Sequence, residues 1–163
     1  MNNDNRMGEI TISAVGDMML SDAFYRHQSG VASSLKKYGD TFLDPEILKL
    51  FRKSDITFCN VECILSDLDH KVGSVRSEYM RGQPEFCKYL SEWGITVANV
   101  ANNHILEQGV NAAINSVHNL QNEGIAVTGS GVGDDFSSGF NAINIEENGI
   151  KIAIISACLI KDP

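Results

Sequence analysis

Two carboxylates, an amide and an imidazole occur where buried strands of this sequence are expected to end. These side chains are Asp17, Glu62, Asn103 and His104. Carboxylate and amide oxygens ligate hard and borderline metals, and an imidazole exchanges a proton near neutral pH. Two acids held close together repel each other, and a divalent cation relieves that repulsion. The set therefore has the groups needed for metal-assisted phosphoryl chemistry, with His104 able to protonate a leaving group.

Each side chain also has an ordinary structural explanation. Asp17 could cap the following helix, and Glu62 could mark the point where its strand reaches solvent. The Asn-rich turn could be purely structural, because asparagine tolerates left-handed conformations. The carboxyl ends of parallel strands meet at one edge of a sheet, however, so residues far apart in the sequence become neighbours there. This convergence favours one shared pocket over three unrelated features.

The elements that would position these residues alternate along the chain. Strands are expected at 9–15, 55–61, 95–100 and 125–128, helices at 44–53, 84–93 and 109–122, and a hairpin with strands at 142–145 and 150–157. Alternation of this kind predicts an α/β fold with a largely parallel sheet or layered sandwich. Asn60 and Glu62 are two residues apart, so on a strand they would point the same way.

Other histidines, cysteines and glycines carry weaker signals. His70 and Arg81, in a long loop at 66–82, are expected to be exposed, and His118 lies beside the apolar stripe of its helix. The four cysteines have no CxxC spacing and lie in or beside apolar segments, which predicts buried reduced thiols. The Gly-rich turn beginning at Gly129 lacks the residues of a phosphate-binding loop.

Composition narrows the class of partner. The chain has 163 residues and a formal charge of -8, with scattered Lys and Arg, which argues against nucleic acid as the main partner. The longest nearly apolar run, 152–160, is about half the ~20 residues of a membrane helix, and the N-terminus lacks an apolar signal core. We therefore expect no membrane segment and a cytoplasmic location.

Three motifs in this order resemble the bacterial capsule-synthesis family. They are Gly16-Asp17-Met18-Met19-Leu20, the segment 55–62 ending in Asn60-Val61-Glu62, and Ala101-Asn102-Asn103-His104. These CapA-type, poly-γ-glutamate biosynthesis proteins are relatives of the calcineurin-like metallophosphoesterases. The resemblance implies a layered α/β sandwich with a two-metal site for Mn, Fe or Zn. It assigns Asp17, Glu62 and Asn103 as ligands, Asn60 as a neighbour, and His104 as the residue that assists the leaving group.

The same resemblance makes residues 9–163 the N-terminal portion of a metallophosphatase domain, after a disordered tail at 1–8. Two departures stand out: Met19 occupies the position of a phosphoesterase histidine, and no histidine follows His118. Two functions remain open. One is metal-dependent hydrolysis of a phosphorylated or polyanionic substrate in capsule, poly-γ-glutamate or related polysaccharide biosynthesis. The other is a non-catalytic accessory role in polymer synthesis or export.

Overall fold

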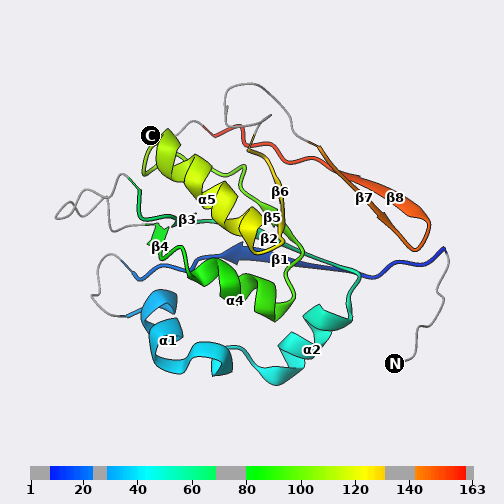
Figure 1. Ribbon diagram of the computed structural model, residues 1–163, viewed down its shortest axis with the longest axis horizontal. Helices are drawn as coiled ribbons and strands as arrows, with labels where there is room; N and C mark the ends of the chain where they lie inside the picture. Colours follow the sequence, from blue (N-terminus) through cyan, green and yellow to red (C-terminus); the bar gives the residue numbers. More distant parts are fainter. Residues whose placement is uncertain (1–7, 24–28, 69–79, 131–141, 161–163) are drawn as a thin grey trace.

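A parallel sheet with helices packed on it forms the centre of the molecule (Figure 1). The computed structural model describes residues 8–23, 29–68, 80–130 and 142–160. The strands are β1 (Ile12–Met18), β2 (Ile56–Val61), β3 (Ile64–Leu65), β4 (Arg81–Gly82), β5 (Val97–Asn99), β6 (Ala126–Thr128), β7 (Ile143–Glu147) and β8 (Ile150–Ile154). The helices are α1 (Val31–Tyr38), the short 3-10 helix η1 (Gly39–Thr41), α2 (Pro45–Lys53), α4 (Phe86–Trp93) and α5 (Val110–Asn122).

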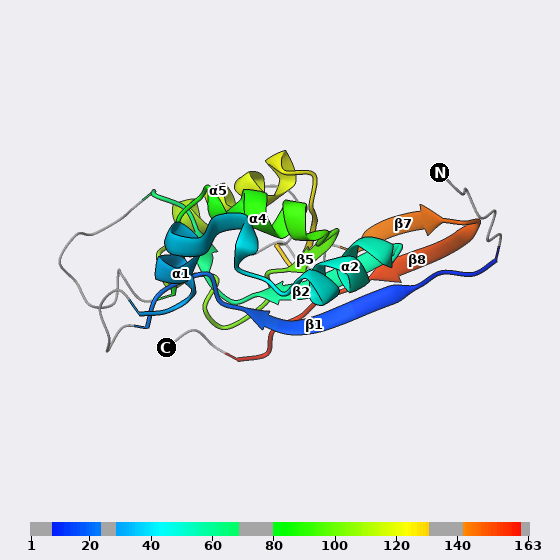
Figure 2. The same cartoon turned by 90° about the horizontal axis from the view of Figure 1, so that it is seen from below.

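The central sheet has the strand order β1-β2-β5-β6, and every neighbouring pair is parallel. Figure 2 shows α1, α4 and α5 on the same side of this sheet. Cys59, Val61 and Ala98 belong to the core that these helices share with the sheet. Because successive side chains of a strand point to opposite faces, Asn60 and Asn99 point away from the helices. The expected α/β class is confirmed, with a helix layer on a parallel sheet.

Local signals determine where several helices begin and end. Asp44 accepts a hydrogen bond from the backbone N–H of Glu46 (2.8 Å), and Pro45 takes the first helical position of α2. Gly94 ends α4 in a left-handed conformation with φ of 95°, which glycine adopts without strain. The expected helices at 44–53, 84–93 and 109–122 are therefore confirmed to within about two residues.

The hairpin of β7 and β8 turns at Asn148-Gly149, as expected for an Asn-Gly turn. Both turn residues have positive φ, 52° and 78°. The turn is hydrogen-bonded to the segment that precedes β1, because Gly8 N–H donates to the Asn148 carbonyl (3.0 Å) and Asn148 Nδ2 donates to the Glu9 carbonyl (3.1 Å). The expected tail at 1–8 lies outside the described residues except for Gly8.

Four expectations need correction. Strand β1 continues to Met18, so Asp17 lies within the strand and not after it. The segment expected as one loop at 66–82 ends in a short strand, β4, which pairs with β3; residues 69–79, with His70, lie outside the described part. Arg81 is buried and not exposed, since its guanidinium donates to the carbonyls of Ser66 and Leu68 (2.5 and 2.9 Å). Three cysteines are buried free thiols as expected, but Cys158 is exposed.

Candidate functional site

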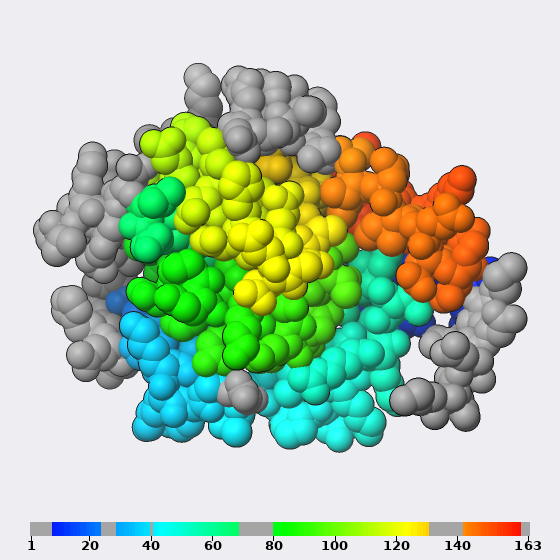
Figure 3. Space-filling view, in the orientation of Figure 1, coloured from blue at the N-terminus to red at the C-terminus, as the bar shows by residue number. Residues whose placement is uncertain are grey.

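A row of polar side chains crosses all four strands of the central sheet at their carboxyl ends. The register aligns Asp17 of β1 with Asn60 of β2, Asn60 with Asn99 of β5, and Asn99 with Thr128 of β6. This row points away from the helices. Figure 3 shows the helical face, where α4 and α5 (green to yellow) cover the sheet. The strand ends converge as the sequence predicts.

A β-bulge brings Asp17 into this row. From the pair Ala14–Phe58 to the pair Asp17–Asn60, β1 advances by three residues and β2 by two, so β1 contains one extra residue. Without the extra residue, Asp17 would be opposite Val61 and would point towards the core. The bulge turns its carboxylate to the open face, beside Asn60.

Asn60 connects the two acids. Its Nδ2 donates to Asp17 Oδ1 (2.8 Å) and to Glu62 Oε2, so both carboxylates lie within hydrogen-bond reach of one nitrogen. Asp17 is exposed, whereas the Glu62 side chain is only 14% exposed. The expectation that Asn60 and Glu62 point the same way is confirmed. Two negative charges are thus held together at the edge of the sheet.

The imidazole of His104 lies next to these acids. Its Nε2 is 3.8 Å from Glu62 Oε1 and 3.0 Å from Asn103 Nδ2, while Nδ1 is 2.8 Å from Glu107 Oε1. Because an ionised carboxylate can only accept, the contact with Glu107 orients the ring with a hydrogen on Nδ1. The predicted residues Glu62, Asn103 and His104 are therefore in one neighbourhood, and Asp17 joins them through Asn60.

Glu107 is the residue of this site that the sequence analysis missed. Its side chain is 6% exposed and ends against His104, on a turn in which the Glu107 N–H donates to the His104 carbonyl (3.1 Å). The signal was present in the sequence, because an acid three residues after a histidine can return to it within a single turn. A buried carboxylate at Nδ1 fixes the orientation of the ring.

The loop that carries His104 is held by its neighbours on the sheet. Asn99 Oδ1 accepts from the Ala101 N–H (2.9 Å), and the Val100 N–H donates to the Thr128 carbonyl (2.9 Å). Gly129 has φ of 93°, and a Cβ there would lie 2.5 Å from the Ala101 Cβ. Glycine at this position is therefore required for the close approach of the two chain segments.

The carboxylates of Asp17 and Glu62 and the imidazole of His104 are groups that commonly ligate divalent cations. Within the described ranges, however, no three His, Cys, Asp or Glu side chains gather into a group that could hold a metal ion. Cys63, next to Glu62 in the sequence, is a buried thiol whose pKa burial raises to about 12, and it accepts from the Leu20 N–H (3.2 Å). Asp17, Glu62 and His104 therefore lie close together, but the described residues form no complete set of metal ligands.

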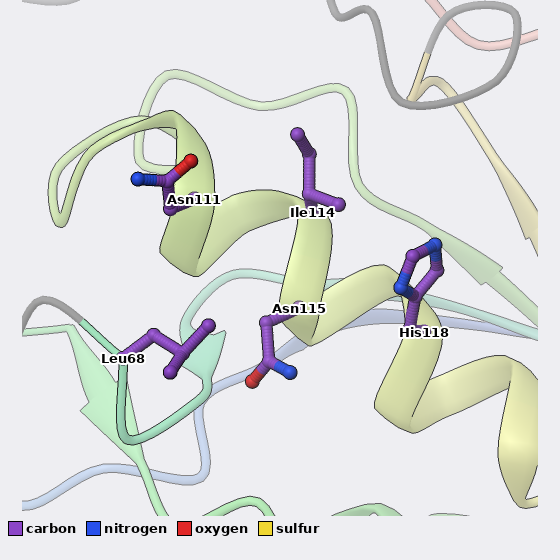
Figure 4. A pocket seen from close by; sticks show the side chains of 5 residues that line it. All are labelled: Leu68, Asn111, Ile114, Asn115 and His118. Carbon is purple, nitrogen blue, oxygen red and sulfur yellow. The ribbon is translucent and has the colours of Figure 1, made fainter.

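A cavity of about 370 Å³ on the outer side of α5 is separate from this row (Figure 4). Asn111, Ile114, Asn115 and His118 of α5 line it, with Leu68 opposite. Among the described residues, no acid contributes to its lining. His118 lies on this flank of the helix, as its position beside the apolar stripe predicts.

Comparison with known proteins gives a family match for the chain. The model of the family described as "Bacterial capsule synthesis protein PGA_cap" matches residues 11–162. "Capsule biosynthesis protein CapA" of Bacillus anthracis is 24% identical over 149 residues, which cover 90% of this chain and 34% of that protein. "Uncharacterized protein y4uA" of Sinorhizobium fredii is 28% identical over 157 residues, 93% of this chain and 31% of the relative. The chain thus spans about a third of the length of these relatives. No helix within the described residues combines the length and the apolar character needed to span a bilayer.

Proposed function

The chain belongs to the bacterial capsule synthesis family PGA_cap, and on this premise we propose that it hydrolyses a phosphoester with the help of divalent metal ions. The substrate would be a phosphorylated or polyanionic intermediate of capsule, poly-γ-glutamate or related polysaccharide biosynthesis. The observation that carries the proposal is the pair of carboxylates, Asp17 and Glu62, on one amide group, with His104 Nε2 at 3.8 Å from Glu62. The charge of a phosphate requires an opposite charge at such an acidic site.

The cation would be held by Asp17, Glu62 and Asn103, with His104 beside them. A bound divalent ion supplies a Lewis acid for a phosphoryl oxygen and offsets the repulsion between the two acids. The chain's own contribution is the fixed placement of these donors at the ends of β1, β2 and β5. Carboxylate and amide oxygens of this kind suit Mn, and Fe and Zn also accept carboxylate ligands.

His104 is suited to proton transfer at one specific atom. Glu107 engages Nδ1 (2.8 Å), so a proton given to a leaving-group oxygen has to come from Nε2, the nitrogen that faces Glu62. The buried Glu107 carboxylate stabilises the imidazolium that forms when Nε2 takes up a proton. Glu107 is therefore a positioning residue in this proposal, acting through His104.

Metal content tests the proposal directly. Protein purified without chelator is analysed by mass spectrometry for Mn, Fe and Zn, beside Asp17→Ala and the control Asp55→Asn. The Asp55 carboxylate also accepts a hydrogen bond, from the Thr11 backbone N–H (2.7 Å), but just before the opposite end of β2. We expect metal in the wild type and the control and its loss in Asp17→Ala. Equal metal content in all three proteins would remove the proposed site.

A second candidate is a non-catalytic accessory role in polymer synthesis or export. The incomplete donor set among the described residues favours it. A chromogenic phosphodiester assay with the metal-loaded protein separates the two candidates. Turnover that Glu107→Gln and His104→Ala both lower supports hydrolysis, whereas a metal-loaded wild type without turnover supports the accessory role.

A further inference from the structure

Asn60 makes every hydrogen bond that a primary amide can make. Its Nδ2 donates to Asp17 Oδ1 (2.8 Å) and to Glu62 Oε2. Its Oδ1 accepts from Asn99 Nδ2 (2.7 Å) and from Asn102 Nδ2 (3.2 Å). A primary amide has two N–H donors and two acceptor lone pairs, so each of its four positions is used once.

The two neighbouring asparagines determine which way the Asn60 amide points. Asn99 Oδ1 accepts from the Ala101 backbone N–H (2.9 Å), which leaves the Asn99 NH2 group facing Asn60. Asn102 is fixed at both ends, because its Oδ1 accepts from the His104 N–H (3.0 Å) and its Nδ2 donates to the Val61 carbonyl (2.8 Å). Backbone groups have a fixed polarity, so the oxygen and nitrogen of these amides are assigned without ambiguity.

These hydrogen bonds determine which atom of the Asn60 amide faces the two acids. Both neighbours present N–H groups, so Asn60 has to present its oxygen to them and its nitrogen to Asp17 and Glu62. An amide nitrogen with two hydrogens cannot ligate a cation, since it has no available lone pair. Asn60 is therefore not a metal ligand, although it lies between the two carboxylates.

We propose that Asn60 is a positioning residue that fixes the geometry of Asp17 and Glu62, with Asn99 and Asn102 setting its polarity. One oxygen of each acid is committed to Asn60, namely Asp17 Oδ1 and Glu62 Oε2. The atoms that would bind a cation are then Asp17 Oδ2 and Glu62 Oε1, and the latter is the Glu62 oxygen near His104. The consequence for cation binding rests on the function proposed above, whereas the positioning itself does not.

The positioning is tested in metal-free protein by NMR of ¹⁵N-asparagine-labelled samples. Asn60→Ala identifies the Asn60 NH2 signals by their loss. We expect Asp17→Asn to shift one of the two N–H protons and Glu62→Gln to shift the other, because each proton has one acceptor. Asn99→Ala should shift both, and Asn111→Ala on the exposed side of α5 should shift neither. Asn60 signals that respond to neither acid variant would overturn the inference, whether or not the protein binds metal.

The effect on cation binding is measured as the Mn²⁺ dissociation constant by calorimetry. Loss of a hydrogen bond to a metal-ligating group typically weakens binding 10- to 100-fold, so Asn60→Ala should bind Mn²⁺ at least about 10-fold more weakly. Asn99→Ala should weaken binding less, and the double variant should lose less than the product of the two single effects, since Asn99 acts through Asn60. Wild-type affinity in Asn60→Ala, or fully multiplicative effects, would contradict the inference. A wild type that binds no Mn²⁺ would refute the proposed function, and the NMR result would still decide the role of Asn60.

Discussion

Asp17 and Glu62, whose carboxylates both accept from Asn60 Nδ2, should make the metal-free protein less stable than it would be with only one of these charges. Two oxygens that accept from the same NH2 group at ordinary hydrogen-bond lengths lie about 5 Å apart. At that distance the repulsion between unit charges is about 1 kcal/mol in bulk water and about 3 kcal/mol at the effective dielectric constant of a protein surface. Asp17 is exposed, so the lower end of this range applies.

Replacing Asp17 by asparagine should therefore stabilise the metal-free protein. The variant removes the repulsion and keeps an oxygen that can accept from Asn60 Nδ2, as Asp17 Oδ1 does at 2.8 Å. We expect a gain of about 1 kcal/mol in the free energy of unfolding, which for a chain of this length raises Tm by about 2–4 °C. Such a gain at the expense of function is common where like charges are gathered for binding.

The assay is urea unfolding and a thermal melt in EDTA, repeated with excess Mn²⁺. Asp55→Asn is the control, because the Asp55 carboxylate also accepts a hydrogen bond, from the Thr11 backbone N–H, and no second described acid side chain accepts from that donor. In EDTA we expect Asp17→Asn to have a higher free energy of unfolding than the wild type. The control Asp55→Asn should have the same free energy of unfolding as the wild type or a lower one. With Mn²⁺ at about 100 times its dissociation constant the wild type should gain about 2.7 kcal/mol and the order should invert.

One result would refute the electrostatic argument. If Asp17→Asn in EDTA loses as much stability as Asp55→Asn, the acids do not repel each other measurably, and the site has no electrostatic need for a cation. The inversion with Mn²⁺ is a separate outcome, which tests whether a cation binds at all.

Further predictions concern the thiols and the loop that carries His104. The buried thiols are Cys59, Cys63 and Cys87. Burial raises the pKa of each to about 12, so at pH 8 Ellman's reagent should modify only Cys158 in the native protein and all four thiols in guanidinium. Because these folded-state pKa values lie above the unfolded value of 9.0, the stability they confer is fully present below pH 9 and is lost as the pH rises towards 12. Where the unfolded chain has lost these three thiol protons and the folded protein keeps them, the free energy of unfolding should fall with pH by at most about 4 kcal/mol per pH unit. Urea unfolding from pH 8 to 11 measures this slope. Gly129→Ala should cost about 2–4 kcal/mol, from strain at φ of 93° and the contact with Ala101; Gly124→Ala, with φ of 78° and open space, should cost about 1 kcal/mol. Equal losses in the two glycine variants would exclude a role for the Ala101 contact.

Sequence patterns predicted those parts of the fold that depend on nearby residues. The cap and proline at Asp44-Pro45, the left-handed Gly94 and the Asn148-Gly149 turn act within a few residues of themselves. The strand after each helix follows from alternation, and the parallel order then places the carboxyl ends together. Fold class and the neighbourhood of Glu62 and His104 could therefore be predicted without coordinates.

Arg81 shows why the remainder could not be predicted. Its guanidinium is buried because carbonyls of Ser66 and Leu68, well before it in the sequence, accept its hydrogens. A charged residue in a polar segment is usually exposed, and only the tertiary arrangement supplies acceptors that allow burial. The amide network at Asn60 has the same origin, since it depends on the register of β2 against β5.

The face of the sheet on which Asp17 lies depends on the one extra residue that the bulge adds to β1. Strand periodicity assigns alternate residues of β1 to alternate faces, and by that count Asp17 belongs with Val61 on the side of the core. A carboxylate there would be buried without the donors that it has beside Asn60, at a cost of several kcal/mol. The extra residue between Ala14 and Asp17 reverses the assignment for everything that follows it in the strand. Since the sequence signal for a bulge is no more than a glycine near a strand end, the alignment of Asp17 with Asn60 is established by the backbone pairing of two strands 43 residues apart.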